Sequence, residues 1–215
     1  MPKTAASTRS APKTENSDAG GRTNKGQQRI SSILEEARTL FVEGGYGALT
    51  MRGVADRVGI SLSNVQHYFS SREALLKALL QEVVGNYDKA YASLDETPQD
   101  PQKKLQGVLR YLLTDIKKAE TERIFVEIWS MATRDEVARS LLDEMYCYHR
   151  KQLERLIAEA YPQLRKEKIA LRACLVAMQI EGLMLVLADS KPRHPELKGV
   201  DEECLRSIHA VLSAP

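Results

Sequence analysis

The sequence predicts an all-α protein of about nine helices. Three observations support this prediction. Apolar residues recur three and four positions apart along most of the 215 residues, and no stretch alternates apolar and polar residues as a half-buried strand would. Glycine and proline residues divide these apolar stripes into segments of helical length. Because 43% of the residues are hydrophobic and 28% are charged, the chain can bury a core, and wholesale disorder is excluded.

Residues 1–26 are expected to form a disordered basic tail. The segment contains no Val, Ile, Leu, Phe, Tyr or Trp, so it cannot bury enough apolar surface to offset the entropy lost on folding. It carries five basic and two acidic residues, whereas residues 27–82 carry six of each. Two interpretations stay open: a solubilising leader, or a flexible arm that contacts phosphates or the minor groove of DNA.

The first four helices are predicted from stripes and caps. An apolar stripe runs from Ile30 to Phe41, and Gly44-Gly45 ends this helix. Thr50 is expected to cap a short second helix that runs to Val58, and Gly59 then permits a tight turn. Ser61 is expected to cap a third helix that runs to about Phe69. A capping box from Ser70 to Glu73 opens the fourth helix. We therefore expect one domain over residues 27–73.

The remaining chain, residues 74–215, is expected to form a second helical domain. Its helices are predicted from Asp100-Pro101, over Thr121–Thr133, from a Thr133 cap to Tyr161, over Leu164–Asp189 and near Asp201–Leu212. The longest apolar run, from Ala173 to Ala188, is broken by Gln179 and Glu181, so no transmembrane helix is expected.

Residues 50–69 have the pattern of a helix-turn-helix, in which the second helix enters the major groove of DNA. If Val65 faces inward, Ser63 and His67 point away from the core, and Asn64 and Gln66 flank them. This face is small, polar and uncharged, whereas a solvated helix usually carries Lys or Glu. Asn and Gln can pair with adenine, Ser can bond to base edges, and Leu62 can contact a thymine methyl group. The N-termini capped by Thr50 and Ser61 can hold phosphates.

The combined run resembles the TetR family of transcriptional regulators. The resemblance rests on Thr50 with Val54-Ala55, Val58-Gly59-Ile60-Ser61, Tyr68-Phe69 and Ser71-Arg72-Glu73, and it covers about residues 27–80. His67-Tyr68-Phe69 is similar to the branch that contains the choline-responsive BetI regulators. Ser63 stands where the family usually has Gly, and Gln66 where it frequently has an aromatic residue. From the motif and the resemblance together, the predicted DNA-binding residues are Thr50, Met51, Arg52, Ser61, Leu62, Ser63, Asn64, Gln66, His67, Tyr68 and Arg72.

The same resemblance implies that the second domain binds a small-molecule effector and forms a homodimer. Candidate effector-binding residues are aromatic, Met or acidic residues of its apolar helices: Phe125, Trp129, Met145, Tyr148, Met178 and Glu181. For each of them, packing in the core or an exposed position is the alternative. Glu181 lies in the most apolar helix, where a carboxylate faces a solvated groove, pairs across a dimer interface or binds a polar or cationic ligand. Trp129 and Glu181 together could bind an ammonium group.

Tyr146, Tyr148 and His149 are not expected to face inward together, since 146 and 148 lie about 200° apart on a helix. Ala173, Ala177 and Gly182 favour close packing of their helix, through which a two-fold dimer would form a four-helix bundle. A dimer would place two recognition helices about 34 Å apart on a palindromic operator. The predicted function is a ligand-responsive, dimeric regulator of transcription that represses an operator.

Other functional classes find less support in the sequence. An enzyme would need a catalytic motif, and none of GxGxxG, GxxxxGK[ST], GxSxG or HExxH is present. No metal site or cofactor is expected, because the four histidines and three cysteines lack metal-ligand spacing. The odd number of distant cysteines favours reduced thiols in a cytoplasmic protein. An activator of the same family, and a helical ligand carrier or interaction protein that does not bind DNA, stay open as alternatives.

Overall fold

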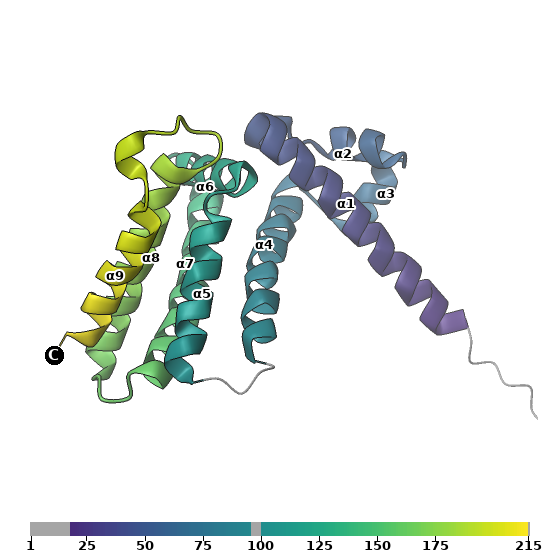
Figure 1. Ribbon diagram of the computed structural model, residues 1–215. Helices are drawn as coiled ribbons and strands as arrows, with labels where there is room; N and C mark the ends of the chain where they lie inside the picture. The colour runs from purple at the N-terminus through teal and green to yellow at the C-terminus, as the bar shows by residue number, and fades with distance from the viewer. Residues whose placement is uncertain (1–17, 96–99, 215) are drawn as a thin grey trace, which may run out of the picture.

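The computed structural model describes residues 18–95 and 100–214, and within these ranges every regular element is helical. The elements are α1 (Asp18–Ala48), α2 (Met51–Val58), α3 (Leu62–Tyr68), α4 (Arg72–Asp95), α5 (Pro101–Asp115), α6 (Ala119–Ala132), α7 (Glu136–Ala160), α8 (Lys166–Leu187), a 3₁₀ turn η1 (Pro195–Leu197) and α9 (Val200–Ser213) (Figure 1). The described residues thus contain nine α-helices, as the sequence predicts.

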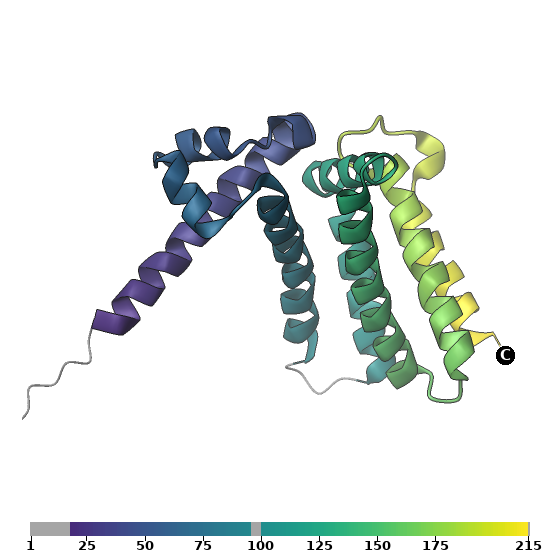
Figure 2. The same ribbon diagram turned by 180° about the vertical axis from the view of Figure 1, so that it is seen from behind.

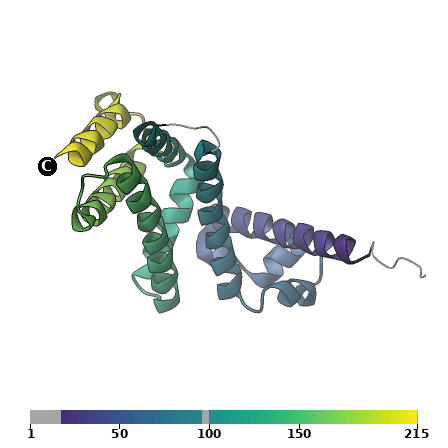
Figure 3. The ribbon, with the colours of Figure 1, turned by 90° about the horizontal axis from the view of Figure 1, so that it is seen from below.

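The helices form two groups that share α4. In Figures 1 and 2, α2 and α3 lie beside α1, and α5, α7, α8 and α9 form a bundle on the other side of the molecule. The view from below shows α4 standing between the bundle and the long α1 helix (Figure 3). α6 lies across the end of the bundle and contacts both α1 and α7.

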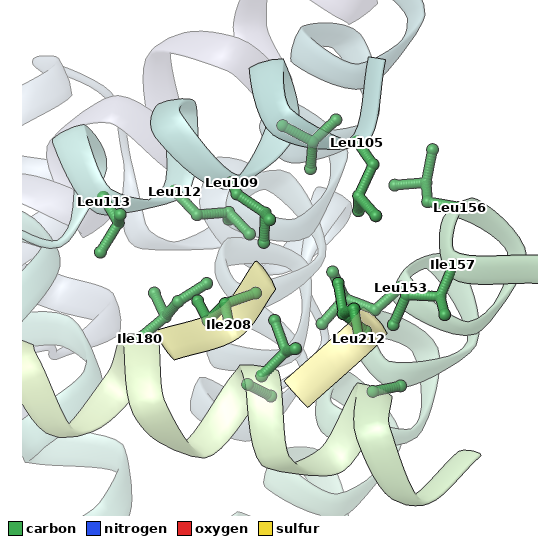
Figure 4. Close-up of a cluster of buried hydrophobic side chains, with 14 of the residues drawn as sticks. Leu105, Leu109, Leu112, Leu113, Leu153, Leu156, Ile157, Ile180, Ile208 and Leu212 are labelled. Atoms are coloured by element: carbon green, nitrogen blue, oxygen red, sulfur yellow. The ribbon is translucent and has the colours of Figure 1, made fainter. Parts of the chain in front are cut away.

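Each group has its own hydrophobic core. The first core contains Phe41 of α1, Val54 of α2 and Val65 of α3, together with the α4 leucines from Leu75 to Leu80. The second core contains mainly leucine and isoleucine side chains of α5, α7, α8 and α9 (Figure 4). α4 contributes to both cores, because its Tyr91 packs in the second. The division into domains at residue 73 stays a prediction.

The caps of the helix-turn-helix agree with those predicted from the sequence. The Thr50 hydroxyl accepts a hydrogen bond from the Gly53 amide at 3.0 Å, and the Ser61 hydroxyl accepts one from the Asn64 amide at 3.2 Å. Gly59 has a φ of 71°, the left-handed conformation that glycine adopts without a steric penalty. These local interactions fix the turn between α2 and α3.

Three sequence predictions of where a helix starts are wrong in detail. α1 begins at Asp18, so residues 18–26 are helical rather than disordered, because extending a formed helix adds a hydrogen bond for each residue that is fixed. Residues 1–17 of the predicted tail lie outside the described residues. Ser71, not Ser70, accepts the capping hydrogen bond of α4, from the Ala74 amide. Asp135, not Thr133, caps α7, by accepting from the Ala138 amide at 2.7 Å.

α8 has a buried apolar side and an exposed apolar side. Ala173 and Ala177 face the core of their own chain, while Leu171, Leu175, Met178 and Leu185 are exposed, at the spacing of a helical stripe. By length and composition alone, α8 could also cross a membrane. Of its most apolar stretch of 18 residues, 39% is buried within the protein. Because α8 packs against α7 and α9, it is a component of the bundle with one uncovered face.

Candidate nucleic-acid interface and ligand cavity

The outward face of α3 is polar and uncharged, as the helical period predicts. Ser63, Asn64, Gln66 and His67 are exposed, while Val65 is fully buried in the first core. In the described part of the chain, the side-chain contacts of this face are all local, between residues 61 and 68. The face therefore offers several hydrogen-bonding groups to a base edge without breaking an interaction that holds the fold.

Local contacts order the rest of this surface. The hydroxyls of Ser61 and Ser63 lie 3.0 Å apart, and the rings of His67 and Tyr68 meet edge to face at 5.1 Å between centroids. Leu62 and Tyr68 are half-buried, so only part of each side chain can reach a partner. Contacts among neighbouring side chains of α3 and its N-cap therefore order this surface.

The N-terminus of α2 lies next to this surface. Thr50 and Arg52 are exposed and Met51 is half-buried. A Cβ on Gly53 would lie 2.9 Å from the Thr50 hydroxyl oxygen and 3.5 Å from a Leu40 methyl group, which explains the glycine at the first turn. The N-terminus of α2 and the exposed Arg52 guanidinium together can bind a phosphate.

Arg72, which is also among the predicted DNA-binding residues, makes contacts within the chain. Its guanidinium donates to the backbone carbonyl oxygen of Tyr46 and lies over the Tyr46 ring, 3.5 Å from the centroid. The Tyr46 hydroxyl in turn reaches the Glu73 carboxylate at 3.4 Å. Arg72 therefore joins the start of α4 to the end of α1, whereas the other ten predicted residues lie on α2, α3 and their caps.

Two of the arginines near this surface, Arg38 and Arg57, are paired with carboxylates of the same chain. Arg57 pairs with Glu43 at 2.6 Å and lies 3.8 Å from Glu36, and Arg38 pairs with Glu120 of α6 at 2.9 Å. Pairing of this kind agrees with the equal numbers of basic and acidic residues over 27–82. Selective contacts on α3, rather than a broad positive potential, are what this surface offers to a nucleic acid.

A cavity of about 570 Å³, including its opening, lies between α4, α5, α6, α7 and α8. Four of the six predicted effector-binding residues line it: Phe125, Met145, Tyr148 and Glu181. Trp129 packs beside Phe125, with 6.1 Å between ring centroids, but it does not line the cavity. Met178 lies on the exposed side of α8 with 60% of its surface accessible. The structure thus brings four of the residues together and separates two.

Sequence reasoning missed several residues of the cavity wall. Tyr87, Asp88 and Tyr91 come from α4, and Gln152 comes from α7. Tyr146, Tyr148 and His149 all line the cavity, contrary to the expectation from their angular spacing. The reason is that the cavity extends along more than one side of α7, from α8 toward α4. A helical period gives relative angles on one helix, but not the shape of the space around it.

Glu181 is a carboxylic acid in an apolar environment. Burial raises its pKa from 4.5 to about 7, against the opposing effects of the Tyr146 hydrogen bond and the Arg150 charge. The Trp129 indole nitrogen donates to the Tyr146 hydroxyl at 2.6 Å, and Tyr146 bonds to Glu181. Trp129 and Tyr146 therefore position the carboxylate. His149 is neutral in this wall, because burial lowers its pKa to about 4.

α6 links the cavity to the helix-turn-helix. Phe125 lines the cavity, and two residues later the Glu127 carboxylate accepts a hydrogen bond from the Tyr46 amide at 2.7 Å. Gly45 has a φ of 66°, and a Cβ there would lie 2.6 Å from a Glu127 carboxylate oxygen. Gly44 and Gly45 are not helical and interrupt α1 near its end, which makes a kinked turn before α2. This turn is fitted closely against α6, so a displacement of α6 would also displace the turn.

Comparison with known proteins gives a consistent result. The sequence profile of the tetR family of bacterial regulatory proteins matches residues 33–79. An HTH-type transcriptional regulator encoded in the dhlA 5′ region of Xanthobacter autotrophicus is 34% identical over 165 residues, which cover 74% of this chain and 79% of that protein. The HTH-type transcriptional regulator BetI of Burkholderia ambifaria is 26% identical over 159 residues, or 73% of this chain and 80% of BetI.

Solved structures share the fold. A TetR-family transcriptional regulator from a Rhodococcus species superposes with a TM-score of 0.72 at 18% identity, over 87% of this chain and 100% of that one. The helix-turn-helix and the helical bundle are therefore arranged here as in known regulators of transcription.

Proposed function

This chain belongs to the TetR family of bacterial transcriptional regulators, which are DNA-binding proteins rather than enzymes, and from this premise we propose that it is a dimeric repressor in the cytoplasm. In this proposal two copies bind a palindromic operator, and a small-molecule effector that enters the cavity releases them. The observation that carries the proposal is the exposed, uncharged hydrogen-bonding face of α3. A recognition helix needs such a face to read base edges in the major groove.

The proposed ligand response is supported by the position of α6. This helix carries Phe125 in the cavity wall and Glu127 at the turn before α2. An effector that favours a different position of α6 would change the orientation of the recognition helix, and binding of effector and operator would then oppose each other. The strength of this coupling depends on how much more tightly the effector and the operator each bind their preferred conformation of the protein.

The proposed dimer is supported by the exposed apolar side of α8. Leu171, Leu175, Met178 and Leu185 form a stripe that also includes the exposed Gly182. A stripe of this kind is a usual feature of protein–protein interfaces. A second copy of the chain would cover it by two-fold symmetry, which matches the symmetry of a palindrome.

Selection of binding sites from sheared genomic DNA by the purified protein tests this function. We expect enrichment of one short palindrome, with half-sites one helical turn or a multiple of it apart. Enrichment should weaken as salt is raised, because phosphate contacts contribute to affinity. Failure to enrich any sequence at any salt concentration would contradict the proposal and leave a ligand carrier or an interaction protein as the function.

A further inference from the structure

The wall of the cavity contains acidic groups but no basic ones. Asp88 of α4 and Glu181 of α8 line it, and no lysine or arginine is among the described lining residues. His149, the remaining titratable nitrogen base of the wall, is held neutral by burial. Arg150 of α7 acts on Glu181 through its charge but does not line the cavity, and it lies 3.4 Å from the Cys147 sulfur. A ligand with a negative charge would therefore meet carboxylates and no counter-charge.

The rest of the wall is aromatic and apolar. The rings of Tyr87, Tyr91, Phe125, Tyr146 and Tyr148 line the cavity beside aliphatic side chains. Aromatic faces attract an alkylated cation through their quadrupole, and this attraction is strongest where water is excluded. The Tyr91 hydroxyl is buried without a hydrogen-bond partner in the described part of the chain, so it is available to a polar group of a ligand.

The cavity opens toward the surface between α4 and α7. A neighbouring surface groove shares four residues with the cavity wall, Val84, Asp88, Met145 and Tyr148. Where groove and cavity meet, the Tyr148 hydroxyl donates to Asp88 at 2.7 Å, and 39% of the Tyr148 surface is accessible. One carboxylate thus lies at the opening, and the other lies deeper, against α8.

We propose that the effector is a small organic cation that enters past Tyr148 and Asp88 and binds with its charged group beside the Glu181 carboxylate. This inference rests on the proposed ligand response and specifies the chemical class of the effector. The aromatic rings enclose the alkyl groups of the cation, and Glu181 supplies the counter-charge. Trp129 and Tyr146 hold the carboxylate in place through their hydrogen bonds.

Three probes of similar shape and different charge test the proposal: choline, the neutral 3,3-dimethyl-1-butanol and the anionic 3,3-dimethylbutanoate. Binding to the purified full chain is measured by titration calorimetry without DNA. We expect choline to bind at least tenfold more tightly than the neutral alcohol, and the carboxylate not to bind. Glu181→Gln should weaken choline binding at least tenfold and leave the affinity for the alcohol unchanged. Glu159→Gln, on the exposed surface of α7, should bind choline as the wild type does.

The proposal is overturned if the neutral or the anionic probe binds as tightly as choline, if Glu181→Gln binds choline as the wild type does, or if choline does not bind to the folded protein. Thermal unfolding of each variant verifies that it is folded. Operator selection is carried out separately, so a palindrome recovered by a protein that fails to bind choline would refute this inference and leave the proposed function intact.

Discussion

Asn64 and His67 carry the proposed recognition of DNA, because both side chains are exposed on α3 and neither supports the core. We expect Asn64→Ala and His67→Ala each to weaken operator binding by about 5-fold to 150-fold, since a specific base contact contributes about 1–3 kcal/mol. The midpoint of thermal unfolding should not change. Fluorescence anisotropy with the selected operator measures the affinity.

Ser140→Ala is a suitable control for these two variants, because Ser140 is exposed on α7, away from α3. It should bind the operator as the wild type does. If Asn64→Ala and His67→Ala also retain wild-type affinity, α3 does not read the operator through these side chains.

Glu181 gives the stability of the protein a predictable pH dependence. Its pKa is raised from 4.5 to about 7 in the folded state, so between these values the unfolded chain releases a proton that the folded chain retains. The free energy of unfolding therefore falls as pH rises through this window, and the full penalty is present above it. Glu181→Gln lacks the penalty. We expect this variant to unfold at a higher temperature than the wild type at pH 8 and at nearly the same temperature at pH 4.5.

Tyr146 and Arg150 of α7 act on Glu181, and His149 of α7 and Asp88 of α4 are further titratable groups of the cavity wall. All four are present in both proteins, so the difference between the two unfolding curves reports on Glu181. Circular dichroism at the two pH values makes the measurement. An equal difference in melting temperature at both values would show that Glu181 does not titrate in this window.

Among the helices, α6 contacts both the cavity, through Phe125, and the turn before α2, through Glu127. We expect Glu127→Ala, which removes the hydrogen bond to the Tyr46 amide, to preserve binding of the cationic probe but to reduce its effect on operator affinity. Coupling between two sites typically amounts to 5-fold to 150-fold in affinity, and most of this factor should disappear. The measurement is operator affinity with and without saturating probe.

Glu120→Ala is the matched control, because Glu120 is also on α6 and pairs with Arg38 of α1 through an exposed contact. Exposed ion pairs contribute little to the stability of a fold, so this variant should respond to the probe as the wild type does. A Glu127→Ala protein that still releases the operator fully would show that the signal travels by another route.

The elements differ in how well the sequence predicts them. Thr50, Gly59 and Ser61 each act within one turn of the chain, and the helix-turn-helix they define was predictable residue by residue. The starts of α4 and α7 were predicted with the wrong cap, because Ser70 and Thr133 each have a competing capping residue one or two positions later. Local signals identify the region of a helix start, and the packing of the whole helix selects the residue.

The cavity was only partly predictable for a different reason. α8 is apolar on both its buried and its exposed side, so its sequence does not reveal that Met178 faces outward while Glu181 faces the cavity. Tyr87 and Tyr91 were missed because the cavity wall includes a face of α4 whose partners are far away in the sequence. The contact of Arg72 with the Tyr46 ring was not predictable either, because the two residues lie 26 positions apart in the sequence.

For the whole molecule, the exposed stripe of α8 makes a prediction about assembly. Met178→Glu places a charge on this stripe, and we expect the variant to be a folded monomer in light-scattering measurements at a concentration where the wild type is a dimer. Its operator affinity should fall, because one recognition helix contacts one half-site. Val137→Glu, which alters an apolar residue of α7 that is 49% exposed, should stay dimeric. A dimeric Met178→Glu protein would place the interface elsewhere.

The most direct test of a dimeric operator reader is the affinity for the selected palindrome when its two half-sites are moved apart by five base pairs, about half a helical turn. Two recognition helices held by one dimer reach successive major grooves on the same side of the duplex, and half a turn moves one half-site to the opposite side. We predict that affinity for the spaced operator falls to that of a single half-site. Unchanged affinity for the spaced operator would contradict it, because the two half-sites would then be bound independently.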